Sequence, residues 1–441
     1  TPHIMRKSNY LMGIIAASAL FACSEVELTD IREKTEENVK EIETVEDDLR
    51  AKEEDIFNAE YTTRKDIVLD TQNNTIHNQF NDFSWNTFSK IFSNKEDANL
   101  LFSPLSLNQN IMMLSNGLKG ETREEILKAF GISDFSLEEI NSYILQLNEG
   151  LNGADSRTKY RTNNAIWHAN SMSVQQEFKE NISEVYETDI FPAMMNNQTL
   201  DSINAWANEK TFGRIKNMVK NLGPNTVAIM VNTVYFRGLW TEELPDKQIN
   251  DGEFINENGE TEQTRMVWYP KYALYAEGNT YQTTVRHFGN EAFAMDFILP
   301  KEGVSAFDAL IEFMTTKGYG SEYKQVHLKF PIFEAVSEMN LNELLQSLGI
   351  NRLFSCTSPE EICLFDSPVF VSSVIQKTSI SVDEKGTEAA ACTQISFDVT
   401  YNGEEQKPKI VEMVLNRPFF YTIRETSTNT PLFIGYQGSV K

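Results

Sequence analysis

The segment that decides the fold lies near the C-terminus, at residues 381–409, and reads SVDEKGTEAAACTQISFDVTYNGEEQKPK. After Gly386, small, β-branched and aromatic residues alternate with their neighbours in the period-two pattern of a half-buried strand. The Ala run at 389–391 has low strand propensity and offers little area for packing. A segment that is patterned for burial but weakly held suits a loop that is exposed first and inserted into a sheet later; a plain surface hairpin is the alternative. The positions that would face a sheet interior are Thr387, Ala389, Ala391, Thr393, Ile395, Phe397 and Val399.

The composition limits the possible functions. The 441 residues are 41% hydrophobic, which is enough for one large domain or two ordinary ones. The net charge of -25 argues against nucleic-acid partners, because binding phosphates requires a basic face. The chain has only five His and carries no HExxH, GxSxG, P-loop or CxxC motif. We therefore expect no catalytic residues, no metal site and no cofactor.

The N-terminal region is typical of an export signal followed by a tether. Residues 1–23 contain a basic start at Arg6 and Lys7, then an apolar run that is too short to cross a bilayer. The run ends in Leu-Phe-Ala-Cys, which looks like a bacterial lipobox, so we expect lipidation of Cys23 after cleavage; ordinary signal cleavage is the alternative. Residues 24–66 are highly charged, with acids well in excess of bases, and predict a solvated tether. We therefore expect an exported outer-membrane lipoprotein, periplasmic or on the cell surface, that touches the membrane only through its lipid.

Several separated motifs, in the correct order, resemble the serpins, the serine-protease-inhibitor superfamily. Residues 382–391, VDEKGTEAAA, resemble the hinge of the serpin reactive-centre loop. Residues 231–240, VNTVYFRGLW, resemble a strand of the main serpin sheet, and the segments NRPF at 416–419 and PLFIG at 431–435 resemble the paired strands that close the fold. The resemblance covers about residues 70–440. It implies an α+β serpin fold with three β-sheets, about nine helices and an exposed reactive-centre loop.

The resemblance also assigns roles to individual residues, within a serpin domain at 67–441 whose loop lies at about 384–409. Strands part to admit the loop at a shutter beneath the main sheet, and the loop enters at a breach. Gln376 stands where the family usually has a shutter His, so charge-dependent gating there is not expected. The serines of this set also suit simple helix caps, and Trp240 suits a core aromatic. The shutter and breach residues are Ser103, Ser106, Asn232, Gln376 and Trp240, and the hinge residues are Glu384, Gly386, Thr387, Glu388, Ala389, Ala390 and Ala391.

The implied function is the trapping of serine endopeptidases. A protease attacks the loop, an acyl-enzyme forms, and the freed hinge inserts into the main sheet before hydrolysis finishes. Counting from the hinge places the cleaved bond at Thr400–Tyr401, with Val399, Asn402 and Lys407 as alternatives. Elastase-like or chymotrypsin-like serine proteases are the expected partners of a monomeric inhibitor, and papain-like cysteine proteases are a further class. A non-inhibitory serpin that acts as a binding or scaffold protein is the alternative function.

Three further cysteines could carry chemistry of their own. Cys356 and Cys363 bracket a short loop and could pair in an oxidising envelope or stay free thiols. Cys392 lies on the outward register of the loop, where a small tolerated residue is the simplest interpretation and a redox role is the alternative.

Overall fold

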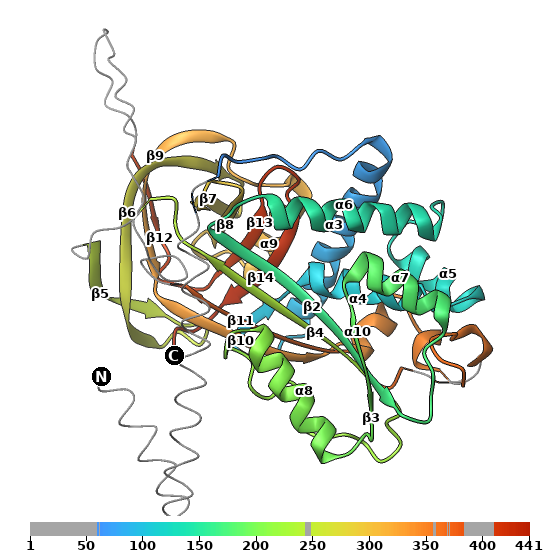
Figure 1. Ribbon diagram of the computed structural model, residues 1–441. Helices are drawn as coiled ribbons and strands as arrows, with labels where there is room; N and C mark the ends of the chain where they lie inside the picture. The colour runs from blue at the N-terminus through green and yellow to red at the C-terminus, as the bar shows by residue number, and fades with distance from the viewer. Residues whose placement is uncertain are drawn as a thin grey trace, which may run out of the picture. The chain divides into compact units, whose positions relative to one another are not determined.

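Figure 1 shows the computed structural model of the chain, which describes residue 60 and residues 62–242, 248–355, 359–367, 369, 371–382 and 410–441. The described residues form both helices and sheets, which confirms the predicted α+β class. They contain eight α-helices, where the resemblance implied about nine. The helices are α3 (Thr71–Ser93), α4 (Pro104–Ser115), α5 (Gly120–Ala129), α6 (Leu137–Gly153), α7 (Gln176–Tyr186), α8 (Asn197–Lys210), α9 (Ala306–Thr316) and α10 (Asn342–Ser347), with the 3-10 turns η3 (Arg352–Phe354) and η4 (Pro359–Glu361).

The largest sheet has nine strands and pairs the early strand β1 with the last strand of the chain. Its order is β1-β14-β13-β8-β7-β6-β9-β12, with β5 paired to β6. All neighbours are antiparallel except β12, which runs parallel to β9. The predicted closing strands are β13 and β14, and their pairing confirms that prediction. The strands are β1 (Asn99–Phe102), β5 (Ile249–Ile255), β6 (Thr261–Glu277), β7 (Tyr281–Phe288), β8 (Phe293–Pro300), β9 (Glu322–Pro331), β12 (Val411–Val414), β13 (Phe419–Glu425) and β14 (Pro431–Gln437).

Two smaller sheets bring the total among the described residues to three, as predicted. One has the order β3-β2-β4 and the other contains β10 and β11. The predicted strand at 231–240 is the C-terminal part of β4, which ends at Gly238. A Cβ at this glycine would lie 2.9 Å from the ring of Phe288, so no larger residue fits there without movement. The strands are β2 (Thr158–Ala169), β3 (Asp189–Ala193), β4 (Ala228–Gly238), β10 (Phe333–Asn340) and β11 (Ile375–Val382).

Helix α8 covers one face of the β3-β2-β4 sheet (Figure 1). Ile203 and Ala207 of α8 pack in one buried cluster with Trp167 of β2 and Val231 of β4. Because neighbouring strand residues point to opposite faces, Ile166 faces the other way and joins the main core of the protein. Both faces of β2 and β4 are therefore covered. Strand β2 is paired on both edges, by β3 and by β4, whereas β4 lies at the edge of this sheet.

The first described residues already contact the globular part. The Ser156 hydroxyl donates to the Glu60 carbonyl at 2.7 Å, and Asn290 Nδ2 donates to the Thr62 carbonyl at 3.1 Å. Arg64 Nη1 donates to the Glu291 carbonyl at 3.2 Å. These contacts extend the globular part into residues that the sequence assigned to the tether.

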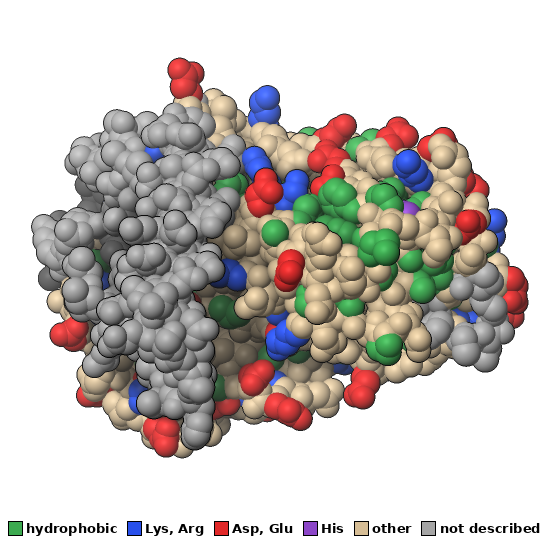
Figure 2. Space-filling model, turned by 60° about the horizontal axis from the view of Figure 1, so that its bottom comes forward, with side chains coloured by type: hydrophobic (Ala, Val, Ile, Leu, Met, Phe, Trp, Pro, Cys, Tyr) green, Lys and Arg blue, Asp and Glu red, His purple; other side chains and the backbone are tan. Residues whose placement is uncertain are grey.

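The surface of the described residues carries mixed charges. Figure 2 shows Asp, Glu, Lys and Arg side chains interspersed over one face, beside an area where hydrophobic side chains gather. Within the same residues, no helix combines the length and the apolar character needed to cross a bilayer.

Candidate functional site

Strands β4 and β11 lie side by side but belong to different sheets. Within the described part of the chain, β4 pairs with β2 and β11 pairs with β10, and no ladder joins β4 to β11. Cα atoms of the two strands nevertheless approach within 8 Å. A strand inserted between them needs two inter-strand spacings, about 9 to 10 Å. The two blocks must therefore separate before a further strand can enter, and the contacts between them set the difficulty of that movement.

Gln376 of β11 binds the residue that precedes α4. The Ser103 amide donates to Gln376 Oε1 at 3.0 Å, and Gln376 Nε2 donates back to the Ser103 carbonyl at 2.8 Å. The Ser103 hydroxyl does not cap the helix; it donates to the Leu432 carbonyl of β14 at 2.8 Å. Next to this contact, Thr378 Oγ1 donates to the Leu101 carbonyl of β1 at 2.9 Å. Strand β11 is thus fixed to the segment that runs from β1 into α4.

Ser106, the third residue of α4, binds strand β4. Its hydroxyl donates to Asn232 Oδ1 of β4, and Asn232 Nδ2 donates to Asn164 Oδ1 of β2 at 2.8 Å. Asn164 Nδ2 in turn donates to the Tyr186 carbonyl at the end of α7 at 2.9 Å. All of these side chains are buried, so an unpaired group among them would be costly. The N-terminus of α4 therefore contacts both blocks, β11 through Ser103 and β4 through Ser106.

A second contact between the blocks is ionic. Lys377 of β11 donates to the Asn217 carbonyl in the segment that leads to β4. Glu338 of β10 accepts from Lys377 and from Lys220 of that segment, each at 3.1 Å. Partial burial alone would raise the pKa of Glu338, but the hydrogen bonds from Lys220 and Lys377 outweigh it and lower that pKa. The carboxylate stays charged near neutral pH and bridges the two blocks.

Comparison with known proteins identifies this arrangement. The family model described as Serpin (serine protease inhibitor) matches residues 78–437. The chain belongs to the serpin family. The match begins within α3 and ends at the last residue of β14, so it includes both blocks and the segment between β11 and β12.

Individual relatives agree with the family. A serine proteinase inhibitor of Cavia porcellus is 28% identical over 348 residues, which make up 77% of this chain and 83% of the relative. The Alpha-1-antiproteinase S of Cavia porcellus is 27% identical over 364 residues, 80% of this chain and 87% of the relative. The crystal structure of the thermophilic serpin Tengpin in the native state matches with a TM-score of 0.73 at 27% identity, over 87% of this chain and 98% of that chain. This serpin is a non-catalytic member of a family of protease inhibitors.

The serpin structure brings four of the five predicted shutter and breach residues together and places the fifth elsewhere. Ser103, Ser106, Asn232 and Gln376 meet at the start of α4, as the contacts above describe. Trp240 lies beyond the end of β4 and stacks on Phe288, with ring centroids 4.3 Å apart and an interplanar angle of 12°. The shutter and breach roles of these residues remain predictions.

Arg286 completes the surroundings of Trp240 in a way that sequence reasoning missed. Its guanidinium carbon lies 4.2 Å from the ring centroids of both Trp240 and Tyr269, and 5.5 Å from that of Phe330. Arg286 is 2% exposed and donates through Nη2 to the Glu242 carbonyl at 3.2 Å. The buried guanidinium therefore makes desolvated cation–π contacts with three rings, and these contacts fix the orientation of the Trp240 indole.

The remaining predicted positions lie outside the described residues. These are the hinge from Glu384 to Ala391, the candidate cleavage residues Val399, Thr400, Tyr401, Asn402 and Lys407, the lipidation residue Cys23, and Cys356 and Cys392. Described residues do border the loop on both sides. Val382 is buried and pairs with Phe333, and Ile410 leads directly into β12.

Sequence reasoning also missed Asn164 in the hydrogen-bonded network. This residue is 3% exposed and links Asn232 to the end of α7. The available signal was the pair Asn163-Asn164 inside a strand, where Asn is depleted. A strand position that alternation places inside and that carries an amide predicts a buried polar network, because such groups are almost always paired.

Proposed function

We propose that this serpin inhibits serine endopeptidases as a suicide substrate, with residues 383–409 as the segment that the protease cleaves. The observation that carries the proposal is the pair of facing edges on β4 and β11, which the side chains around α4 connect in place of a ladder. An incoming strand would satisfy both edges at once and would bury apolar side chains against the sheet. The family and the relatives named as proteinase inhibitors support the same function.

The contacts suggest how insertion would proceed. A strand that enters between β4 and β11 must break the ionic bridge of Glu338 with Lys220 and Lys377, which lies near the solvent. The bonds of Ser103 with Gln376 and of Ser106 with Asn232 then resist the separation of the two blocks. These polar contacts are few compared with the ladder that replaces them, so insertion is downhill once the segment is cut.

Incubation with elastase, chymotrypsin and papain, followed by denaturing electrophoresis, tests the proposal. We expect a covalent complex with at least one serine protease, together with release of a C-terminal peptide whose mass locates the cut at Thr400–Tyr401 or at a neighbouring bond. Cleavage without a complex, with full protease activity remaining, would refute inhibition. The peptide mass separately decides among the candidate bonds.

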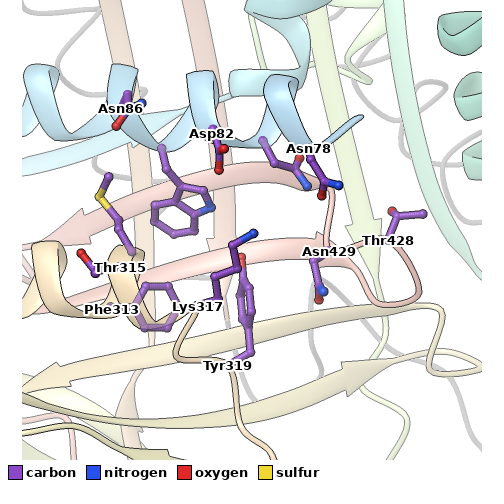
Figure 3. Close-up of a pocket in the computed structure, with 12 residues that line it drawn as sticks. Asn78, Asp82, Asn86, Phe313, Thr315, Lys317, Tyr319, Thr428 and Asn429 are labelled. Carbon is purple, nitrogen blue, oxygen red and sulfur yellow. The ribbon is translucent and has the colours of Figure 1, made fainter. Parts of the chain in front are cut away.

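A second candidate is a binding protein without inhibitory activity, and a cavity favours it. The cavity has a volume of about 500 Å³ and lies between α3, α9 and the turn from β13 to β14 (Figure 3). Trp85, Phe313 and Tyr319 form its aromatic wall, and Figure 3 shows Lys317 extending toward α3 near Asp82. Aromatic walls with a few polar groups are typical of small-molecule sites. Unchanged protease activity combined with saturable quenching of Trp85 fluorescence by an aromatic carboxylate would support this candidate instead.

We further propose that the serpin is exported and held at the envelope by a lipid on Cys23. The basic start, the short apolar run and the terminal cysteine of that run support this proposal. Labelling of cells with a palmitate analogue should mark the unsubstituted protein and leave Cys23→Ser unmarked. Equal labelling of the two proteins would refute lipidation at this residue.

A further inference from the structure

Four large hydrophobic side chains are exposed on one face of the nine-stranded sheet. Trp268 and Tyr272 of β6 are 37% and 62% exposed, Tyr323 of β9 is 71% exposed, and Ile410, just before β12, is 45% exposed. We refer to these four residues as the aromatic face. Figure 1 shows β6, β9 and β12 side by side, so the residues come from two neighbouring strands and from the start of the third.

Strand register places these side chains together. Tyr272 lies opposite Gln325 and Leu274 lies opposite Tyr323. Opposite residues share a face, as do residues two apart, so Tyr323 and Tyr272 point to the same side. Val411 of β12 lies opposite Val326, which places Ile410 level with Gln325. Tyr272 and Ile410 are therefore level with each other, with one strand between them, at about 9 to 10 Å.

The same alternation sends the other side of β9 into the core. Val326, Leu328 and Phe330 are buried there, while His327 on the aromatic face contacts solvent. His327 Nδ1 donates a hydrogen bond to Glu412 Oε1 at 2.8 Å. This polar pair lies among aromatic side chains, a composition typical of the contact surfaces between proteins. Exposed apolar groups of this size on one surface usually mark an interaction site.

The position of Ile410 identifies the occupant. It is the first described residue after 383–409, so the chain returns to the body of the protein on the aromatic face. Residues that follow a cleaved bond occupy the primed side of a protease cleft. Because these residues lead to Ile410, the primed side of the enzyme would face the aromatic face. A protease–inhibitor contact covers about 800 Å² on each partner, more than an extended peptide alone provides. Surface outside residues 383–409 is therefore needed, and the surface nearest the returning chain is available to supply it.

We propose that the aromatic face is a second docking site for the target endopeptidase, which it contacts through an apolar rim beside the primed side of the cleft. This inference rests on the proposed function. The face would contribute to the encounter complex before cleavage, and it would not affect insertion of the strand afterwards. Proteases with an apolar primed-side rim should consequently be inhibited faster than those with a charged rim.

The double variant Tyr272→Ser with Tyr323→Ser tests the proposal, because both side chains are mostly exposed and their removal leaves the core intact. Met194→Ser is the matched control, since Met194 is 73% exposed and lies beside β3. The inhibition rate constant and the stoichiometry of inhibition are measured with chymotrypsin and elastase. We expect the rate constant of the double variant to fall about fivefold or more with at least one enzyme, at unchanged stoichiometry, and that of Met194→Ser to stay the same.

The other outcomes separate the two proposals. If the unsubstituted protein forms no covalent complex with either enzyme, the proposed function is wrong and this inference falls with it. If complexes form and the double variant is as fast as the unsubstituted protein with both enzymes, only the docking site is refuted. A raised stoichiometry at an unchanged rate would also refute docking, as the face would then act on insertion. A dimer in solution that the double variant loses would assign the face to a second copy and overturn the docking site.

Discussion

Gln376 and Ser103 form a two-point contact, in which the Ser103 amide donates to Gln376 Oε1 at 3.0 Å and Gln376 Nε2 donates to the Ser103 carbonyl at 2.8 Å. The oxygen and nitrogen of a side-chain amide project in the same direction and can serve the donor and the acceptor of one residue. The two ring nitrogens of an imidazole diverge, so a His at this position would serve only one of them. The contact also carries no ionisable group.

Replacement of Gln376 by Leu should weaken the attachment of β11 to α4. The substitution leaves the buried Ser103 amide without a partner and leaves the Ser103 carbonyl with the Leu107 amide alone. We expect a loss of about 1 to 3 kcal/mol in the free energy of unfolding. The urea midpoint of the uncleaved protein measures the effect. Gln263→Leu, at an exposed position of β6, is the control and should change the midpoint little. An unchanged midpoint for Gln376→Leu would show that water replaces the amide there.

Ser106 and Asn232 should be energetically coupled. Ser106→Ala and Asn232→Ala each remove one partner of a buried hydrogen bond, and the double variant removes both. A double-mutant cycle on the free energy of unfolding should give a coupling of about 1 kcal/mol. Additive losses would mean that Asn232 depends on Asn164 alone, and the link between α4 and β4 would then carry no energy of its own.

Thr387→Arg should turn the inhibitor into a substrate. The sequence pattern predicts that Thr387 lies on the inward register of the hinge, so an arginine there would have to enter the sheet with its charge. Glu388→Arg is the matched control. The same alternation predicts that position 388 faces water, so inhibition should persist. The stoichiometry of inhibition by a serine protease measures both variants. Equal stoichiometry for the two would show that the insertion register differs from the predicted one.

His287 should make the protein less stable in mild acid. Burial, assisted by the charges of Arg424 and Arg64, lowers the pKa of His287 to about 4 from an ordinary value of 6.5. The unfolded chain therefore binds a proton at a higher pH than the folded protein does. The contribution is fully present above pH 6.5 and is lost as the pH falls from 6.5 toward 4. The urea midpoint should decline less over this range in His287→Gln, and parallel declines would contradict the assignment.

The sequence predicted the parts of the site that short motifs encode. Ser103, Ser106 and Asn232 come from two motifs far apart in the chain, and they meet because the strand and the helix that carry them are both parts of the arrangement that defines the serpin fold. The resemblance therefore located the network without any distance information. The class, the three sheets and the closing pair β13 and β14 followed from the same motifs.

Other features could not be predicted because they depend on distant packing. Arg286 looks like an ordinary strand cation in sequence, and only the convergence of β6, β9 and the segment after β4 surrounds it with rings. The aromatic face depends on strand register, since a shift of one residue would bury Tyr272 and expose its neighbours. The contacts of the Glu60 and Thr62 carbonyls leave no pattern in the side chains.

The start of α4 has a consequence for how long the uncleaved molecule survives. The main chain of Ser103 and the Ser106 hydroxyl connect it to the side-chain amides of Gln376 on β11 and Asn232 on β4, and all four residues lie outside the segment 383–409 that a protease would cleave. Substitutions at these four positions would shorten or lengthen the working life of the inhibitor while leaving its choice of target unchanged. If the chain inhibits proteases as we propose, its durability and its selectivity depend on different residues, and each could change in evolution or by engineering without loss of the other.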